Sequence, residues 1–514
     1  MKVVTSAQMR EIDKKAGEEF SVPSLQLMEN AGGKVYEAIR SKLGSPDNKV
    51  FYIFAGKGNN GGDGFVVAKQ LSLIRTLTKV FLLGKIEEIR GNARVNLDLA
   101  LKRGVKIIEV KNIEDLDLSP PPDLIIDALL GTGIKGEVTG LMREVIELIN
   151  QQKKPVISVD LPSGLDADSG RVKGSCIKAT WTVTMGLPKI GLLIYPGLEY
   201  VGDLIVADIG FPPSLIEKEN IEVNLTSSEE VKDLLPQRHP DSHKGDYGRV
   251  LVLAGSVGFS GAAYLCSQGA LRMGAGLVTL GIPESLNEVM EVKLTEVMTK
   301  PLPETKEKTL SLRGENVILD LVKRFDVLAL GPGLSTNQET KELVRRLITK
   351  VSIPLIIDAD GLNALAESVG VINKVKAPLI LTPHPGELAR LLKVTIKEVQ
   401  NERIEMAKRA AERLGAILVL KGARTIIARP SGEVFINPTG NAGMASGGTG
   451  DVLTGMIAGL LGQGLKPLQA SLVGVYLHGL AGDLRVKRVG ELSLVATDLL
   501  DALPETVREV ISNQ

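Results

Sequence analysis

The sequence predicts an α/β protein with two domains, and three observations support this prediction. The chain has 514 residues, which is too long for one ordinary hydrophobic core. Short β-branched runs that end in Gly or Asp alternate with longer helical patterns over residues 49–210 and again from 249 onward. The 55 glycines suit the tight turns that join strands to helices. Such alternation is typical of parallel sheets covered by helices.

The elements follow in order along the chain. Thr5 and Gln8 form the signature of a capping box and predict an amphipathic helix before the first strand. The strands expected in the first half are 50–56, 79–84, 123–131, 155–164 and 179–186. Those expected in the second half are 249–256, 276–283, 326–333, 354–361, 378–387 and 416–423.

The two halves are joined by a segment of different character. Pro212 to Gly245 contains proline and charge without a strong strand pattern, so we expect a linker there. The expected domains are a first domain over 1–212, a linker and lead-in over 213–245, and a second domain over 226–514.

Composition excludes several classes of protein. Lysine plus arginine equal aspartate plus glutamate at 61 each, so net charge does not favour nucleic acid or an anionic membrane as a partner. Residues 1–13 contain no apolar run of signal-peptide length, and no segment has about 18 uninterrupted apolar residues. Cys176 and Cys266 match neither a disulfide framework nor a metal-ligand spacing, which predicts two buried apolar side chains. We expect a cytoplasmic homo-oligomer.

The first Gly-rich segment, Gly56 to Gly64, lies between a strand and a helix. Glycines allow the backbone to approach a ligand closely, and a helix start supplies free N–H donors for a phosphate. Residues 56–61 also satisfy the G-x-G-x-x-G pattern of dehydrogenases. The second strand, however, ends in Leu-Leu-Gly-Lys without the acidic residue that binds a ribose, which disfavours a dehydrogenase.

Polar side chains gather where neighbouring strands of the first half end. The string Asn59 to Asp63 presents amides and a carboxylate, whose alternative role is to cap the helix. Asp127 and Asp160 end the third and fourth expected strands, and ligands of parallel sheets bind outside such ends. Asn60, Asp127 and Ser163 together offer oxygen ligands to a hard cation. Zinc is disfavoured because no Cys or His joins them.

The strongest motif of the chain is the run from Asn437 to Asp451, which leads into an apolar helix. Its glycines and small hydroxyl residues leave backbone amides free, and these amides can stabilise a phosphoryl group during transfer. We expect Asp451, at the first helical position, to act as a base toward the attacking group. The alternative role of Asp451 is to complement the helix dipole.

Three further turns support a nucleotide site in the second half: 331–333, 382–387 and 421–425. Lys421 and Arg424 are natural partners for phosphates. His384 lies between two prolines, which indicates a loop position and a held donor or acceptor. The other histidines, His239, His243 and His478, we interpret as mostly structural.

The first half resembles a known family. The strings AGKGNNGGDG, DALLGTGIKGE and VDLPSGLDAD resemble the NAD(P)H-hydrate epimerase domain over about the first 210 residues. The resemblance implies a Rossmann-like three-layer sandwich and a potassium ion at Asn60, Asp127 and Ser163. The substrate-binding residues that it implies are Asn59, Asn60, Gly61, Gly62, Asp63, Gly131, Thr132, Gly133, Ile134, Lys135, Gly136, Glu137 and Asp160.

The second half resembles the ribokinase-like superfamily through G-G-T-G-D. PDSHKGDYGRVLVLAGS, LTPHPGELARLL, VLKGARTIIA and NPTGNAGMASGGTGD narrow the resemblance to NAD(P)H-hydrate dehydratases over nearly all of residues 226–510. It implies a ribokinase-like α/β/α domain that removes water from hydrated NADH or NADPH with ADP and commonly Mg²⁺. The implied substrate contacts are Gly333, His384 and Asp451. The implied adenine-nucleotide contacts are Lys421, Gly422, Ala423, Arg424, Thr425, Asn441, Ala442, Gly443, Met444, Ala445, Ser446, Gly447, Gly448, Thr449 and Gly450. The sequence departs from the family at Ser335, where glycine is usual.

These observations predict a bifunctional nicotinamide nucleotide repair enzyme that uses ADP, or ATP in its place. Asp451 is the expected base for dehydration, and Asp63 and Asp160 are the candidate acid and base for epimerisation. One rival is a small-molecule kinase, such as a vitamin-precursor kinase, with an accessory first domain. A second is a first domain that senses a ligand or partner without catalysis.

Overall fold

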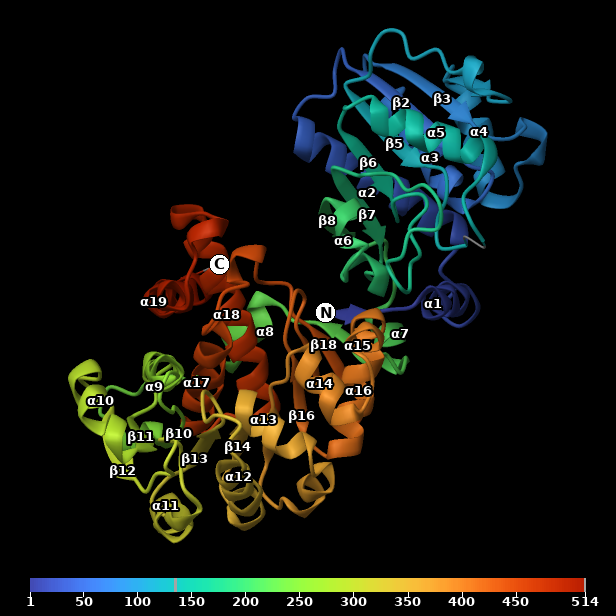
Figure 1. Ribbon diagram of the computed structural model, residues 1–514. Helices are drawn as coiled ribbons and strands as arrows, with labels where there is room; N and C mark the ends of the chain where they lie inside the picture. Colours follow the sequence, from blue (N-terminus) through green and yellow to red (C-terminus); the bar gives the residue numbers. More distant parts are fainter. Residues whose placement is uncertain (134–135, 513–514) are drawn as a thin grey trace. The chain divides into compact units, whose positions relative to one another are not determined.

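The computed structural model describes residues 1–133 and 136–512, which form two compact units. The first unit contains Lys2–Ile221, and the second contains Glu222–Gln514 together with Met1. Each unit is built around its own parallel sheet (Figure 1). The α/β class and the two-domain organisation predicted from the sequence are therefore observed.

The sheet of the first unit has the strand order β4-β3-β2-β5-β6-β7-β8, and all its neighbours pair in parallel. Its strands are β2 (Val50–Ala55), β3 (Leu77–Leu82), β4 (Lys106–Glu109), β5 (Leu124–Ala128), β6 (Val156–Val159), β7 (Trp181–Met185) and β8 (Asp203–Ala207). The short β1 (Lys2–Val3) precedes them in the chain and does not belong to this sheet. Its helices are α1 (Ser6–Glu18), α2 (Ser24–Leu43), α3 (Asn59–Leu71), α4 (Gly91–Lys102), α5 (Gly140–Gln151), α6 (Leu198–Val201) and α7 (Pro213–Lys218).

Alternating side chains of β2 show why this unit has three layers. Phe51 and Ile53 pack into the core that α1 to α4 share, whereas Tyr52 and Phe54 pack into the core formed with α5. All four are completely buried. A strand that buries both faces is a continuous apolar run, which is why β2 was recognisable in the sequence. Thr5 and Gln8 make the expected capping box at the start of α1.

The second unit has a larger sheet with the order β9-β18-β17-β16-β15-β14-β13-β10-β11-β12. Its strands are β9 (Val223–Leu225), β10 (Arg249–Leu253), β11 (Leu277–Pro283), β12 (Met298–Leu302), β13 (Val327–Leu330), β14 (Leu355–Ile357), β15 (Leu379–Leu381), β16 (Ile417–Leu420), β17 (Ile426–Ala428) and β18 (Val434–Ile436). Its helices are α8 (Ser228–Leu234), α9 (Ser260–Arg272), α10 (Asn287–Lys293), α11 (Glu315–Val322), α12 (Gln338–Lys350), α13 (Ala359–Ala366), α14 (Pro385–Leu392), α15 (Ile396–Asn401), α16 (Arg403–Leu414), α17 (Thr449–Gly462), α18 (Pro467–Val489) and α19 (Ala496–Ser512).

Two features of the second unit differ from the sequence-based expectation. β17 pairs antiparallel with both β16 and β18, because the short connections 421–425 and 429–433 allow hairpins but no crossover. The expected linker 213–245 carries α7, β9 and α8 instead, and the units divide between Ile221 and Glu222. β9 has only three residues and joins the sheet by pairing with β18, a long-range contact that local pattern does not reveal.

Helix α17 packs unusually close to α9. A Cβ atom at Gly455 would lie 2.0 Å from the carbonyl oxygen of Cys266, and one at Gly269 would lie 2.6 Å from that of Val452. Glycine is therefore required on both helices for their backbones to approach this closely. Cys176 and Cys266 are free and buried, as expected. Among the described residues, no helix is both long and apolar enough to cross a bilayer.

Candidate functional site

The first site is built where β2 passes into α3. The helix begins at Asn59, with Gly58 at its N-cap and no capping side chain, so the Asn-Asn-Gly-Gly-Asp string lies inside the helix. The alternative that these side chains cap the helix is therefore wrong. A Cβ at Gly56 would lie 2.0 Å from the Leu129 carbonyl oxygen, and one at Gly61 would lie 2.0 Å from the Gly56 carbonyl oxygen. These glycines let α3 start directly against the end of β5.

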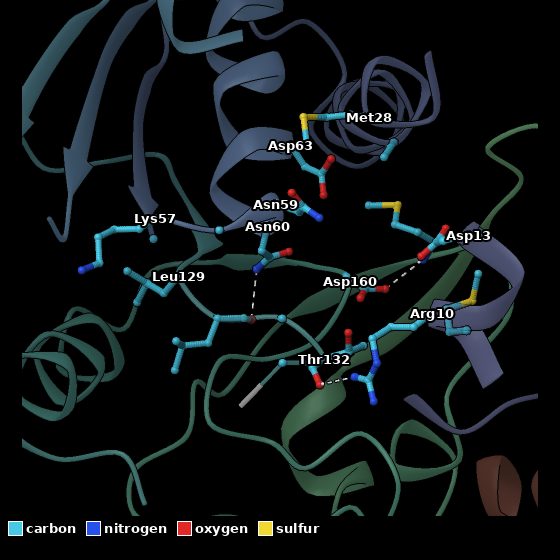
Figure 2. Close-up of a pocket in the computed structure, with 18 of the residues that line it drawn as sticks. Arg10, Asp13, Met28, Lys57, Asn59, Asn60, Asp63, Leu129, Thr132 and Asp160 are labelled. Atoms are coloured by element: carbon cyan, nitrogen blue, oxygen red, sulfur yellow. Dashed lines mark hydrogen bonds between the residues drawn. The ribbon is translucent and has the colours of Figure 1, made fainter. Parts of the chain in front are cut away.

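A cavity of about 850 Å³ opens at this end of the sheet (Figure 2). Most of the residues expected to hold the substrate line it: Asn59, Asn60, Asp63, Gly131, Thr132, Gly133, Gly136, Glu137 and Asp160. Gly61 and Gly62 instead pack against Gly56 and Met28 behind the cavity. Ile134 and Lys135, also expected there, lie outside the described residues. The cavity is large enough for a nicotinamide mononucleotide moiety.

The three residues expected to bind a cation lie together at the base of the cavity. Asp127 is fully buried, and its carboxylate accepts hydrogen bonds from the Ser158 hydroxyl at 2.8 Å and from the Ser163 hydroxyl at 2.5 Å. The Asn60 amide nitrogen donates to the Leu130 carbonyl at 3.0 Å. The Asn60 Oδ1 atom is buried without a hydrogen-bond partner among the described residues. Burial raises the pKa of Asp127, although the hydrogen bonds from Ser163 oppose this rise.

Three aspartates face the cavity from three elements: Asp13 from α1, Asp63 from α3, and Asp160 from the end of β6 (Figure 2). Burial raises the pKa of Asp63 well above its ordinary value, and the nearby Asp160 and Asp13 raise it further. Burial also raises the pKa of Asp13 to about 6. Asp160 is instead paired with Lys189, whose Nζ lies 2.5 Å from Asp160 Oδ1. Asp63, with its raised pKa, thus lies beside a carboxyl group that is paired with a buried lysine.

Sequence reasoning missed Asp13 and Lys189. Asp13 lies on the polar side of an ordinary amphipathic helix, where an acidic residue attracts no attention. Lys189 follows the turn after β7, in the string MGLPK, which matches no motif used above. The signal that was available for Lys189 is its position just beyond the carboxyl end of a predicted strand.

The second site surrounds the start of α17. The helix begins at Thr449, its N-cap Gly448 has a φ of 92°, and Asp451 is its third residue. The sequence-based expectation placed Asp451 at the first helical position, and this was wrong by two residues. Asp451 still lies within the first turn of α17, whose amides are free. The first amides of a helix have no intrahelical partner, so this end can accept a phosphate.

Buried charges from three strand ends surround Asp451. Lys421, after β16, lies 2.5 Å from the Asp358 carboxylate after β14 and 3.9 Å from the Glu387 carboxylate of α14. Burial and the neighbouring Asp358 raise the pKa of Asp451 to about 7, against the opposing effect of Lys421. Burial likewise raises the pKa of Glu387 to about 7. Lys421 therefore pairs with carboxylates at these strand ends, and its expected contact with a nucleotide phosphate stays a prediction.

Gly333 follows β13 and His384 follows β15, the two strands that flank β14 in the sheet. The His384 Nδ1 atom accepts a hydrogen bond from the Gly386 amide at 3.0 Å, which leaves the proton on Nε2 beside Glu387. Burial and the charge of Lys421 lower the pKa of His384, so the ring is neutral at pH 7. Gly333 has a φ of 64°, and Ser335 takes a left-handed φ of 74°.

The remaining nucleotide residues lie in two loops, 421–425 and 441–450. The Arg424 Nη1 atom donates to the Pro438 carbonyl at 2.7 Å, which ties the first loop to the start of the second. The Asn441 amide bonds Asp483 at 2.9 Å, a contact that sequence reasoning missed. His478, treated above as structural, is partly buried and lies 2.8 Å from the Thr449 carbonyl oxygen, and burial lowers its pKa to about 4. His478 thus supports the first turn of α17.

Both halves of the chain match known protein families. One family model, described as YjeF-related protein N-terminus, matches residues 24–191, and another, described as NAD(P)H-hydrate dehydratase, matches residues 250–505. A bifunctional NAD(P)H-hydrate repair enzyme from Moorella thermoacetica is 47% identical over 515 aligned residues, which cover 99% of this chain and 97% of that protein. The chain belongs to this repair-enzyme family. The repair enzyme of Thermofilum pendens is 41% identical over 99% of this chain and 96% of that protein.

A solved structure supports the same family for the second unit. The ADP/ATP-dependent NAD(P)H-hydrate dehydratase of Bacillus subtilis, crystallised with ATP and Mg²⁺, superimposes with a TM-score of 0.50 and 36% identity. The superposition covers 56% of this chain and 99% of the Bacillus subtilis chain. Membership of the repair-enzyme family in both halves favours the repair function over the small-molecule kinase considered above.

Proposed function

We propose that this chain repairs hydrated NADH and NADPH with two activities. The first unit interconverts the R and S epimers of the hydrate, and the second dehydrates the S form at the expense of ADP. The observation that carries this proposal is that each unit has its own site of fitting chemistry. One site pairs a protonated with an ionised carboxyl group, and the other places a carboxylate at a Gly-rich helix start.

Dehydration requires activation of a poor leaving group. The hydrate carries a hydroxyl at C6 beside the ring nitrogen, and Asp451 accepts the proton of this hydroxyl as it attacks the terminal phosphoryl group of the nucleotide. The free amides of residues 447–450 stabilise the charge on the transferring group. The C6–O bond then breaks, phosphate leaves, and loss of a proton from C5 restores the ring double bond.

We assign the other contacts from their positions around this point. Residues 421–425 and 441–450 border the helix start and would hold the nucleotide, with Mg²⁺ on its phosphates. Gly333 and His384 follow β13 and β15, on either side of β14, and would contact the hydrate. The neutral His384 suits a hydrogen bond to a carbonyl or hydroxyl of the substrate.

Epimerisation requires an acid and a base in the same cavity. Asp63, protonated, donates to the C6 hydroxyl, which leaves as water while the ring nitrogen supplies electrons to C6. Water then adds to the opposite face of C6, and the ionised Asp160 accepts the proton that this addition releases. The substrate changes only in its configuration at C6, while one proton has moved from Asp63 to Asp160 and must return to Asp63 before the next turnover in the same direction.

The first site has the donor set for a potassium ion. Asn60 Oδ1, the Asp127 carboxylate, the Ser163 hydroxyl and the Leu130 carbonyl are oxygen ligands around one point, and Asn60 Oδ1 has no other partner among the described residues. The four partners of the buried Asp127 carboxylate are neutral hydroxyl and amide groups, which leaves its charge uncompensated. A bound potassium would supply this charge and fix the loop after β5, where the substrate is held.

We predict that potassium stabilises the first unit. Replacing KCl by choline chloride at equal ionic strength should lower the unfolding free energy of this unit by about 1–3 kcal/mol, because a ligand bound to the folded state alone stabilises by mass action. Calorimetry of the full chain measures this change. Asp127→Asn should abolish the difference between the salts, whereas Asp123→Asn, an exposed carboxylate at the start of β5, should keep it. Equal melting of the native protein in both salts contradicts a potassium site.

The proposed function is tested with the separated hydrate epimers. The full chain should consume the S epimer only when ADP is present, with stoichiometric formation of NADH or NADPH, AMP and phosphate. The R epimer should be consumed as well, through the first unit. A stable phosphorylated product without NADH would instead identify a small-molecule kinase. Failure to interconvert the epimers would leave the first unit as a binding module.

A further inference from the structure

The Asp160 carboxylate is held in one orientation by an unusual local structure. Asp160 has a φ of 65°, a left-handed conformation that residues other than glycine adopt infrequently. Its amide donates to the Val183 carbonyl at 2.7 Å, so the turn after β6 is tied to β7. This conformation directs the side chain across the end of the sheet toward the cavity that it lines (Figure 2).

All three hydrogen bonds of the Lys189 ammonium group are made at the Asp160 carboxylate or next to it. Its side chain is 1% exposed, and its Nζ atom donates to Asp160 Oδ1 at 2.5 Å and to Thr184 Oγ1 at 3.1 Å. The third bond goes to the Met185 carbonyl oxygen at 3.1 Å. An ammonium group has three hydrogens, and all three are used. Lys189 therefore has no hydrogen left for a substrate.

The bonds on Asp160 are divided unequally between its two oxygens. Oδ1 accepts from Lys189 Nζ, from the Thr184 hydroxyl at 3.2 Å and from the Met185 amide at 3.1 Å. These three donors occupy Oδ1, and Oδ2 is the oxygen that remains for a ligand in the cavity. The arrangement resembles a general base whose orientation is fixed by a separate, buried group.

From this geometry we infer that Lys189 is a positioning residue for epimerisation. It fixes Asp160 with Oδ1 bonded and Oδ2 presented to the hydrate, and it places a positive charge against this carboxylate. This inference rests on the function proposed for the first unit and adds a residue that acts through Asp160 without touching substrate.

The charges around Asp160 determine how the inference is tested. Asp13 on α1 and Asp63 on α3 face Asp160 across the cavity, and Lys189 is the ammonium bonded to it. Both neighbouring carboxyl groups disfavour an ionised Asp160, whereas Lys189 favours it. Removing the lysine charge should therefore move the acid limb of the epimerisation pH profile toward higher pH.

The experiment compares Lys189→Met with Lys189→Arg in the full chain. In Lys189→Met we expect kcat for epimerisation to fall about tenfold or more, KM to change little, and the acid limb to move up by about one pH unit. Lys189→Arg should restore much of the kcat for epimerisation and return the acid limb of the pH profile to its wild-type position. Turnover of the pure S epimer with ADP by the second unit of the same molecule should be unchanged.

The matched control is Lys79→Met, which removes another buried lysine of the same unit. Lys79 Nζ bonds Asp117 at 3.0 Å and the Ser119 carbonyl at 2.8 Å, and Lys79 does not line the cavity. This variant should lose stability without any shift of the pH profile. Thr184→Val is the second variant if Lys189→Met does not fold. It removes one hydrogen bond from Asp160 and one from Lys189, so it should move the acid limb of the pH profile in the same direction but by a smaller amount.

The outcomes separate the inference from the function on which it rests. A wild-type chain that does not interconvert the epimers overturns the proposed function itself. A wild-type chain that is active, with a folded Lys189→Met or Thr184→Val variant that keeps both the wild-type kcat and the wild-type acid limb, overturns only the role of Lys189.

Discussion

Asp451→Asn should lower kcat of dehydration by about a thousandfold, within the range of about 10²–10⁴ that a positioned general base supplies. The amide is nearly the same size as the carboxylate but cannot accept the proton of the C6 hydroxyl. Binding of ADP should be retained, because the free amides at the start of α17 are unchanged. Turnover of the S epimer, followed by the absorbance of the NADH formed, measures this loss.

The pH profile gives the same prediction a second readout. The pKa of Asp451 is raised to about 7 by burial, followed by the charge of Asp358. A base works only when deprotonated, so kcat/KM for the S epimer should rise as pH increases through about 7 and then level off. In Asp451→Asn the residual kcat/KM should no longer rise as pH increases through about 7.

A control variant separates catalysis from helix stabilisation. Asp498 is the third residue of α19, just as Asp451 is the third residue of α17, and it pairs with Arg485 at 3.2 Å. Asp498→Asn should therefore cost stability but retain dehydration. If Asp451→Asn were as active as Asp498→Asn, the carboxylate of Asp451 would serve the helix dipole alone.

Asp160→Asn should lower kcat of epimerisation by about 10²–10³-fold, again because a positioned base is lost. The side chain keeps its shape, so the hydrate should still bind in the cavity. The rate is measured by converting pure R epimer with the dehydratase of the same chain as the coupled reporter. The S epimer serves as the reference substrate, since its turnover does not need the first unit.

The control for this prediction is Asp168→Asn. Asp168 accepts a hydrogen bond from the Ser6 amide at 2.5 Å and does not line the cavity. We expect this variant to destabilise the start of α1 while epimerisation by the folded protein persists. An Asp160→Asn variant with full activity would exclude Asp160 as the base and leave Asp63 or Asp13 as the remaining carboxyl groups.

Much of the fold could be predicted from local sequence because the central strands are buried on both faces. β2, β5 and β6 are continuous apolar runs, and their ends carry the polar residues of the first site. The strands β9 and β18 were not predicted. They have three residues each and pair with each other, a contact between segments more than 200 residues apart in the sequence.

The sites were predictable to the extent that they lie on loops with a recognisable pattern. Asn60, Asp127 and Ser163 converge because adjacent parallel strands bring their ends to one edge. Lys189 and Asp13 could not be found in this way, since their importance depends on which charge they face in space. The burial of Lys421 among carboxylates likewise depends on packing, and the sequence alone presents it as an ordinary phosphate ligand.

The glycines shared by α9 and α17 have a consequence for turnover. Because the two backbones touch at Gly269 and Gly455, neither helix can slide or rotate without a collision. Asp451 is consequently attached to a part of the molecule that stays still while nucleotide enters and product departs. Any rearrangement that admits ADP must occur in the surrounding loops, and the geometry of proton transfer is already set before the substrates arrive.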